Sequence, residues 1–238
     1  MAQYVYGKNV VSNLINSNHK VLKLIVLPRE NDEIVRQARD RHIAVSFASR
    51  RELDELAEGN HQGYVALIED YRLYSIEEIT AAANKQYPLV VALDGIQDPH
   101  NLGAVLRTVE CVGGDGVIIE KNRSVSLNPT VAKVSVGAIE RVKVAQVTNL
   151  VQTLKKLKKQ GYWIVGTDVR QASDYRSLKY DMPVVLVIGA EGTGVRPLVL
   201  KECDFKVKLP MEGTVGSLNA SVACGILLYQ IYSQRFPL

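Results

Sequence analysis

Residues 89–108 read LVVALDGIQDPHNLGAVLRT, and this stretch decides the fold class of the chain. An apolar strand ends, a turn rich in Gly, Asp and Pro follows, and a helical pattern then begins. The same order recurs at 184–194, VVLVIGAEGTG, and at 205–221, FKVKLPMEGTVGSLNAS. Ligands of open α/β sheets bind where the strands end. The three turns therefore predict one composite site.

From residue 88 to the end of the chain, apolar segments alternate with helical patterns, which indicates an α/β domain with a mostly parallel sheet. The expected strands span 89–93, 116–119, 142–145, 163–165, 184–188 and 205–209. The last helix is expected over about 217–234 and is apolar around much of its surface. Such a helix must be buried in its own domain, in a partner subunit or in both.

The first 72 residues have strand and helix signals of their own, which predict a smaller α/β unit. Strands are expected over 21–27, 43–47 and 64–68, and a polar helix over about 31–41. The pairs Ser49–Glu52 and Ser75–Glu78 have the spacing of capping boxes at helix starts. We expect three parts: a domain over 1–72, a linker over 73–87 and a domain over 88–238.

The composition is that of a globular protein, because 47% of the 238 residues are hydrophobic and 23% are charged. The sequence has neither an apolar run of transmembrane length nor the features of a signal peptide, so a cytoplasmic protein is expected. The cysteines, Cys111, Cys203 and Cys224, are odd in number and widely spaced, which supports neither disulfides nor zinc. The four histidines show no i,i+4 pairing, so a metal site has no support.

The net charge of +4 is unevenly distributed along the chain. Residues 1–72 hold ten basic and ten acidic residues, whereas residues 86–238 hold eighteen basic and thirteen acidic ones. This excess permits binding to a polyanion, but ordinary solubilising charge explains it equally well. The lysine-rich run at 154–159 is typical of the solvated face of an amphipathic helix.

Asn101 and Arg107 are the polar side chains that follow the first turn. They lie six residues apart, which places them about 120° apart around a helix. They could meet a ligand at the strand ends; alternatively, Asn101 caps the helix and Arg107 is solvated. Spacing alone leaves both explanations open.

The second turn contains Gly189, Gly192 and Gly194, which permit positive φ angles and a close approach of the backbone to a ligand. The spacing G-x-x-G-x-G differs from the dinucleotide fingerprint, which argues against a nucleotide-dependent oxidoreductase, and no P-loop lysine follows. Glu191 would repel a phosphate and suits a ligand with positive charge or hydrogen-bond donors. An ordinary surface turn is the alternative.

The third turn leads into the last helix, where Ser217 or Asn219 has the propensity of an N-cap. The preceding residues 213–216 form a flexible approach that suits a loop around a small molecule. Asp168, after Gly166-Thr167, ends another strand and could line the same crevice. The run His61-Gln62-Gly63 has no interpretation from its residues alone.

Taken together, the three runs resemble the motifs of the SpoU (TrmH) group of RNA ribose 2′-O-methyltransferases, which belong to the SPOUT class. The matching residues are Asp98-Pro99-x-Asn101-x-Gly103 through Arg107, then Gly189-x-Glu191-Gly192-x-Gly194, then Pro210-Met211 and Ser217-Leu218-Asn219-x-Ser221-Val222-Ala223. Tyr6-Gly7 and His61-Gln62-Gly63 resemble the small substrate-binding domain, similar to ribosomal protein L30e, of the branch that methylates a guanosine of 23S ribosomal RNA. The resemblance implies a deep trefoil knot in the second domain and a homodimer formed through it.

The resemblance also implies S-adenosylmethionine as cofactor, RNA as partner, and no metal. The implied catalytic residues are Arg107, Asn101, Glu191, Ser217 and Asn219. The implied cofactor-binding residues are Gly189, Leu209, Leu218, Thr167, Ile188 and Ser217. The alternatives are a tRNA ribose 2′-O-methyltransferase and a non-catalytic RNA-binding or ribosome-assembly factor of the same fold. The intact polar residues of the three motifs argue against the latter.

The role of Arg107 is a hypothesis of its own. The family often assigns this arginine as the base, but a guanidinium stays protonated and is a poor proton acceptor. We expect Arg107 to clamp the phosphate of the target nucleotide, while the ribose proton passes to phosphate or solvent.

Overall fold

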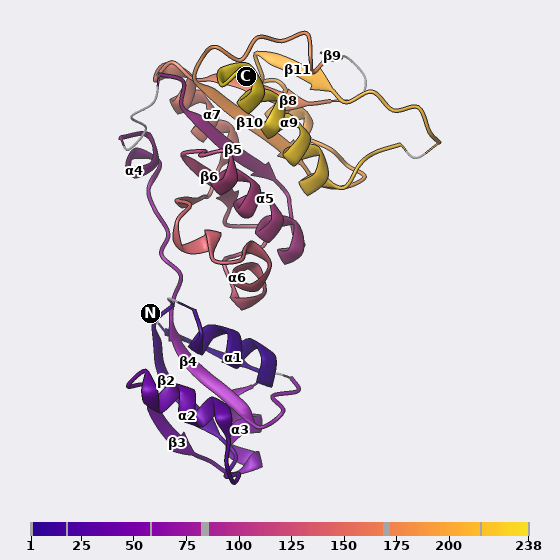
Figure 1. Cartoon of the computed structure of the whole chain (residues 1–238). Helices are drawn as coiled ribbons and strands as arrows, with labels where there is room; N and C mark the ends of the chain where they lie inside the picture. Colours follow the sequence, from indigo (N-terminus) through magenta and orange to yellow (C-terminus); the bar gives the residue numbers. More distant parts are fainter. Residues whose placement is uncertain are drawn as a thin grey trace. The chain divides into compact units, whose positions relative to one another are not determined.

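A computed structural model of the chain describes residues 2–17, 19–57, 59–81, 86–168, 172–214 and 216–237. Its contacts divide the chain into two units, one of residues 1–72 with 128–133, the other of residues 73–127 with 134–238. Each unit has its own β-sheet (Figure 1). Residues 82–85 of the predicted linker and Val215 of the predicted flexible approach lie outside the described residues.

The first unit is a four-stranded sheet with three helices. Its elements are β1 (Ala2–Tyr6), α1 (Lys8–Ile15), β2 (Val21–Val26), α2 (Glu33–Asp40), β3 (Ala44–Phe47), α3 (Arg50–Leu56) and β4 (Tyr64–Glu69). The strand order is β1-β4-β2-β3; β2 and β3 are parallel, and β4 is antiparallel to both of its neighbours. The three expected strands and the expected helix are confirmed to within two residues at either end, whereas the sequence analysis did not include β1 and α1.

Side-chain caps set the starts of two helices in this unit. The Asp32 carboxylate accepts hydrogen bonds from the backbone N–H groups of Ile34 and Val35 at the start of α2. At α3, Ser49 and Glu52 form the predicted capping box, with Ser49 N–H donating to Glu52 Oε2 at 2.7 Å. These caps satisfy backbone donors that a helix start would otherwise leave unpaired.

From residue 73 on, the chain forms a seven-stranded sheet. Its elements are α4 (Ile76–Ala81), β5 (Leu89–Asp94), α5 (Pro99–Cys111), β6 (Gly116–Glu120), α6 (Pro129–Ser135), η1 (Ala138–Glu140), β7 (Val144–Val147), α7 (Leu150–Lys159), β8 (Trp163–Thr167), β9 (Ser173–Asp174), β10 (Val184–Gly189), α8 (Pro197–Leu200), β11 (Phe205–Lys208) and α9 (Ala220–Arg235). The strand order is β7-β6-β5-β10-β8-β11-β9, and every pairing is parallel. The predicted α/β class and its strands are therefore confirmed, while the knot stays a prediction.

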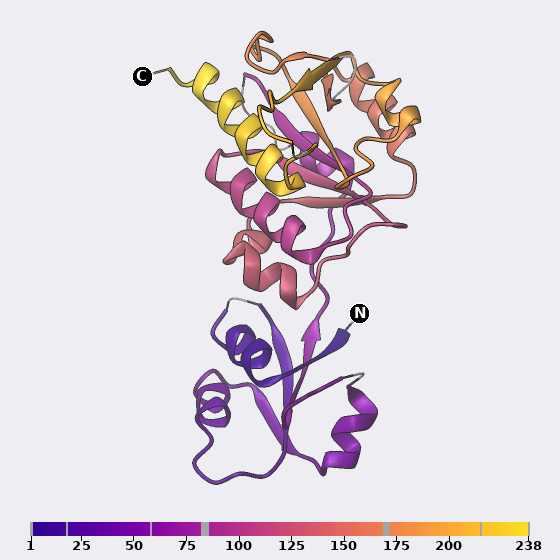
Figure 2. The same cartoon turned by 90° about the vertical axis from the view of Figure 1, so that its right-hand side faces the viewer.

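Helices cover both faces of this sheet (Figure 2). On one face, α7 buries its apolar side chains against alternate residues of β5, β6, β8 and β10. On the other, α5 and α9 pack side by side. Because β5 and β10 are buried along their whole lengths, they read as continuous apolar runs rather than alternating ones. The segment expected as a linker contributes Ile79, which is buried in the α7 core.

The last helix begins at Ala220, three residues later than expected. Cys224, Leu227, Leu228 and Ile231 form its buried side. Its other side exposes large apolar side chains, which are Val222, Ile226, Tyr229, Tyr232 and Phe236. The apolar surface of the last helix thus has two sides. One side packs against the sheet and α5, and the other side is exposed in this chain.

Candidate active site

The carboxyl ends of the central strands lie together at one edge of the seven-stranded sheet. Gly189, the last residue of β10, is in register with Asp94, the last residue of β5. Val207 of β11 is in register with Thr167 at the end of β8. From β5 the chain adds β6 and β7 on one side. The later strands β8, β9 and β11 lie on the other side of β10, so the strand order reverses between β5 and β10, which is the topological switch point of the sheet. Ligands of open α/β sheets bind at this position.

Three of the predicted catalytic side chains form one hydrogen-bond network at this edge. Asn101 Nδ2 donates to Glu191 Oε1 at 3.0 Å, and Asn219 Nδ2 donates to Asn101 Oδ1 at 2.9 Å. Asn219 Nδ2 also donates to Glu191 Oε1. The three residues come from the three motif turns and are 90 and 118 positions apart. The structure therefore brings the three turns into contact through these side chains.

Local sequence explains where two of these side chains lie. Asp98, not Asn101, caps α5: its carboxylate accepts from His100 N–H, and Pro99 occupies the first turn. This frees the Asn101 side chain, only 7% exposed, for Glu191. At α9, Asn219 is the N-cap, and its Oδ1 accepts from the N–H groups of Ser221 and Val222. The open choice between Ser217 and Asn219 is thus settled, and Asn219 serves both helix and network.

The glycine loop, residues 189–195, carries Glu191 and is closed on itself. Gly194 N–H donates to Ala190 C=O at 2.8 Å, and Gly192 and Gly194 have φ angles of +78° and +66°. A Cβ on Gly189 would overlap the backbone of Gly194 and Val195. The loop therefore requires glycine at 189 for space and at 192 and 194 for conformation.

The remaining predicted catalytic residues, Arg107 and Ser217, are not in this network. Arg107 is exposed on α5, and its side chain forms no hydrogen bond or ion pair with any residue that the structure describes. Ser217 is exposed two residues before the Asn219 cap. Both are open to a ligand from outside the chain.

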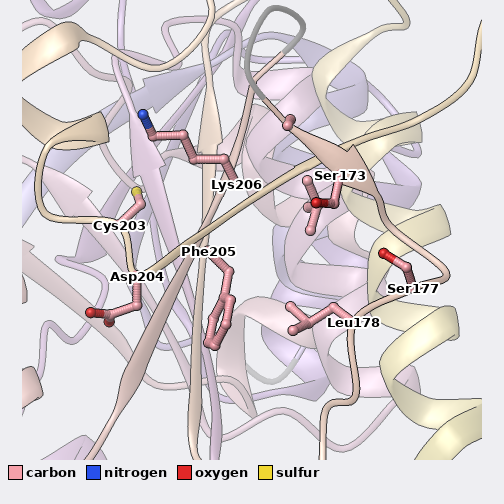
Figure 3. Close-up of a pocket in the computed structure, with 9 residues that line it drawn as sticks. Ser173, Ser177, Leu178, Cys203, Asp204, Phe205 and Lys206 are labelled. Atoms are coloured by element: carbon pink, nitrogen blue, oxygen red, sulfur yellow. The ribbon is translucent and has the colours of Figure 1, made fainter.

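The predicted cofactor residues lie at or next to the same strand ends. Ile188 and Gly189 are buried at the end of β10, and Thr167 Oγ1 donates to Val187 C=O across β8 and β10. Leu209 directly follows β11, and Leu218 precedes the Asn219 cap; both are half-buried. A separate pocket of about 670 Å³ lies at β9 and β11, and none of its lining residues belongs to the predicted set (Figure 3).

An ion cluster at the strand ends escaped the sequence analysis. Arg196 donates from Nε to Asp94 Oδ1 at 2.6 Å, from its backbone N–H to Asp94 Oδ2 at 2.7 Å, and from Nη2 to Glu120 Oε1 at 2.7 Å. Asp94 and Glu120 are 1% and 7% exposed. Hydrogen bonding to Asp94 raises the pKa of Arg196 further above its usual range. The signals available in the sequence were the carboxylates that end two buried strands.

The cluster holds the glycine loop at both ends. The backbone of Asp94 is in register with Gly189 at the start of the loop, and its carboxylate binds Arg196 directly after the loop. Glu191 lies between these two anchors and meets Asn101 and Asn219. One buried aspartate thereby fixes the loop that carries the central carboxylate of the network.

Two protein-family models match the chain, one before and one after the segment 75–87. The SpoU rRNA Methylase family matches residues 88–229, and the model of RNA 2′-O ribose methyltransferase substrate binding matches residues 4–74. The chain belongs to the SpoU family of RNA methyltransferases. It is accordingly an RNA 2′-O-ribose methyltransferase, as the three motifs predicted.

Relatives and solved structures agree with this membership. A Bacillus subtilis protein, YacO, assigned by its name to the TrmH family of tRNA/rRNA methyltransferases, is 42% identical over 98% of this chain and 96% of its own length. A Staphylococcus aureus relative, assigned to the same family, is 43% identical over 97% of this chain and 96% of its own length. The SpoU methyltransferase AviRb of Streptomyces viridochromogenes, solved with AdoMet, has a TM-score of 0.73 at 22% identity, over 98% of this chain and 90% of its own.

Two solved structures of this fold, AviRb and an rRNA methyltransferase of Sinorhizobium meliloti, contain bound AdoMet, which agrees with the predicted cofactor. The residues present fit this group. A Cβ on Gly192, Gly194, Gly213 or Gly216 would meet no atom within 4 Å, so the space beside these glycines is open. The carboxylate of Glu191 suits a cationic ligand and would repel a phosphate.

Over the described ranges, no cluster of three or more His, Cys, Asp or Glu side chains could hold a metal ion. Within the same ranges, no helix has both the length and the apolar character needed to cross a membrane.

Proposed function

We propose that this chain transfers the methyl group of S-adenosylmethionine to the ribose 2′-hydroxyl of a guanosine in 23S ribosomal RNA. The observation that carries the proposal is the Asn101–Glu191–Asn219 network, which links the three motif turns at the switch point of the sheet. The rRNA assignment rests on the resemblance of the first unit to that branch of the family, and the match of residues 4–74 supports RNA as the class of substrate. Transfer RNA is the alternative substrate, and the experiment below separates the two.

The chain's contribution to this reaction is chiefly positioning. When bound, S-adenosylmethionine supplies a methyl group that its sulfonium has already activated. Backbone groups at Gly189, Leu209 and Leu218 would hold it beside the strand ends. The 2′-oxygen must then lie in line with the methyl group and the sulfur, and such alignment accounts for much of the rate gained in group transfer.

In this proposal, Arg107 holds the target nucleotide rather than removing its proton. The side chain is exposed and has no partner among the described residues, so its fork of donors is available to a phosphate. A guanidinium has no lone pair that can accept a proton. The proton of the 2′-hydroxyl would pass to the neighbouring phosphate or to solvent.

The substrate assignment is tested by mapping ribose methylation in cells with and without this gene. Mass spectrometry of 23S, 16S and transfer RNA should show one guanosine of 23S RNA that loses its 2′-O-methyl group in the deletion strain. Isothermal titration of the purified chain with S-adenosylmethionine should release heat. A lost methyl group in tRNA alone would replace the rRNA proposal, and a chain that does not bind the cofactor would exclude methyl transfer.

We also propose that the chain forms a homodimer through the exposed side of α9. Val222, Ile226 and Tyr229 recur at i, i+4 and i+7 and are 50%, 38% and 53% exposed. These positions share one face of the helix. A continuous apolar face of this kind on a folded unit is typical of an interface between subunits.

Placing glutamate at Tyr229 should separate the subunits, because a charge in an apolar interface loses its hydration. We expect Tyr229→Glu to raise the dimer dissociation constant at least tenfold, measured by sedimentation equilibrium. Gln152→Glu, which adds the same charge at an exposed position of α7, is the matched control. A Tyr229→Glu chain with the dissociation constant of the wild type would exclude this face.

A further inference from the structure

The turn His61-Gln62-Gly63, which had no interpretation from sequence, holds an arginine on the surface of the first unit. His61 is buried: its Nδ1 accepts from Gly63 N–H at 2.9 Å, and its Nε2 lies 2.9 Å from Asp54 Oδ1. Gln62 directs its Oε1 to Lys8 N–H at the start of α1, while its C=O accepts from Arg29 Nη2 at 3.1 Å. The turn thus joins the start of α1 to the Arg29 side chain.

The Arg29 guanidinium lies over the Tyr64 ring, and its Nη1 lies 3.5 Å from the Tyr64 hydroxyl. The guanidinium carbon is 5.2 Å from the centroid of the Tyr64 ring, within the range of a cation–π contact. The tyrosine is itself fixed, since its hydroxyl donates to Asp32 Oδ2 at 2.7 Å. Gly63 makes room for the arrangement, because a Cβ there would come within 2.9 Å of Arg29 Nη2.

This arrangement orders an exposed arginine that forms no ion pair with any described residue. Fixing so long a side chain costs conformational entropy. A hydrogen bond to the Gln62 carbonyl, a long one to the Tyr64 hydroxyl and a ring contact, all at the surface, barely offset that cost. A guanidinium plane held in advance instead lowers the cost of binding a ligand, because less freedom remains to be lost.

Arg29 lines a pocket of about 440 Å³ between the start of α1 and the start of α2. Lys8, Asn9 and Ser12 line it from α1, and Asn31, Glu33 and Gln37 are among the residues on the opposite wall. Its volume lies within the range of roughly 300–1,000 Å³ for ligand pockets. Polar groups of both kinds in its walls suit the edge of a nucleobase better than a phosphate, which the acidic residues would repel.

We infer that this pocket binds an unpaired nucleotide of the substrate RNA, with its base stacked on the outer face of the Arg29 guanidinium. Proteins recognise unpaired RNA bases by stacking them on aromatic rings or on guanidinium planes. Only 6% of the residues in this chain are aromatic, so few aromatic rings are available to stack on a base. The Arg29 guanidinium, which lies over Tyr64, offers a planar group in their place. The inference rests on the proposed RNA methyltransferase function and names one contact of its substrate.

The test compares Arg29→Lys, which keeps the charge but loses the plane, with the wild type in the full-length protein. The probes are a ten-nucleotide uridine RNA and an abasic chain of the same length and charge, with binding followed by fluorescence anisotropy. Stacking contributes about 1–3 kcal/mol per base, so we expect Arg29→Lys to weaken uridine binding about five-fold or more. Binding of the abasic chain should stay within about twofold.

Two further variants refine the result. Gly63→Ala retains Arg29 but displaces its guanidinium, so it should lower the preference for the uridine chain as well. Arg50→Lys, on exposed α3, is the matched control and should bind both probes as the wild type does. Equal weakening of both probes in Arg29→Lys would identify a phosphate contact and overturn base stacking; unchanged binding of both would remove Arg29 from recognition.

The same proteins separate this inference from the proposed function. Arg29→Lys should bind S-adenosylmethionine like the wild type and methylate RNA with a raised KM for RNA and an unchanged kcat. A wild-type chain that prefers the uridine probe through Arg29 but methylates no RNA would overturn the proposed function alone. A chain that methylates RNA equally well with Arg29→Lys would overturn this inference alone.

Discussion

Replacing Arg107 by lysine is expected to lower kcat about 10- to 150-fold while leaving the affinity for S-adenosylmethionine within about twofold. A lysine keeps the positive charge but loses the bidentate fork that fits a phosphate. Hydrogen bonds to charged groups contribute about 1.5–3 kcal/mol, and each 1.4 kcal/mol of lost transition-state stabilisation is a factor of ten in rate. The effect should fall on kcat because the clamp aligns the 2′-oxygen with the methyl group.

Single-turnover methylation of RNA and calorimetric titration of the cofactor measure the two quantities separately. Arg141→Lys, an exposed arginine that pairs with Glu110, is the matched control and should keep wild-type turnover. If Arg107→Lys retained full turnover, the clamp would have to be another residue. If it lost cofactor affinity in proportion to turnover, Arg107 would belong to the cofactor pocket.

Replacing Arg196 by methionine is expected to destabilise the second unit by about 3 kcal/mol. The change leaves the carboxylates of Asp94 and Glu120 buried without their cation, and breaking a buried ion pair in this way costs about 3–5 kcal/mol. We expect a cost at the low end of this range because the Arg196 side chain is 41% exposed. Water can therefore reach the two carboxylates once the guanidinium is removed. The free energy of unfolding in urea measures the loss.

Two companion variants test whether the loss of stability comes from the unpaired buried charges. Adding Asp94→Asn to Arg196→Met removes one unpaired charge, so the double variant should lose less than the sum of the two single variants. Arg176→Met breaks the exposed pair with Asp174 and should cost no more than about 1 kcal/mol. A cost for Arg196→Met no larger than that for Arg176→Met would show that the cluster does not hold the fold.

Much of the second unit could be predicted from the sequence because its strands are buried on both sides. β5 and β10 read as uninterrupted apolar runs followed by turn residues, which few other structures produce. The first strand and helix were harder. α1 contains β-branched Val10 and Val11 in a short segment that fits helix and strand patterns equally well, so it blurs the boundary with β1.

The site was predictable as a set of turns but not as a set of contacts. Asn101, Glu191 and Asn219 were found because each stands beside a turn, yet their shared hydrogen bonds depend on strand order, which no local pattern encodes. The contact between Asp94 and Arg196 joins residues 102 positions apart and exists only because β5 and β10 are neighbours. Asp98 was passed over as the α5 cap because Asn101 is an equally good capping residue by propensity.

The double attachment of the glycine loop to Asp94 limits how this segment can diverge. One end is set by backbone register and the other by an ion pair to the same residue, so the span between them is fixed. An insertion or a deletion within the loop would therefore break one attachment or the other. Among homologous sequences, we expect this segment to keep a constant length, with glycine at the positions of Gly189, Gly192 and Gly194.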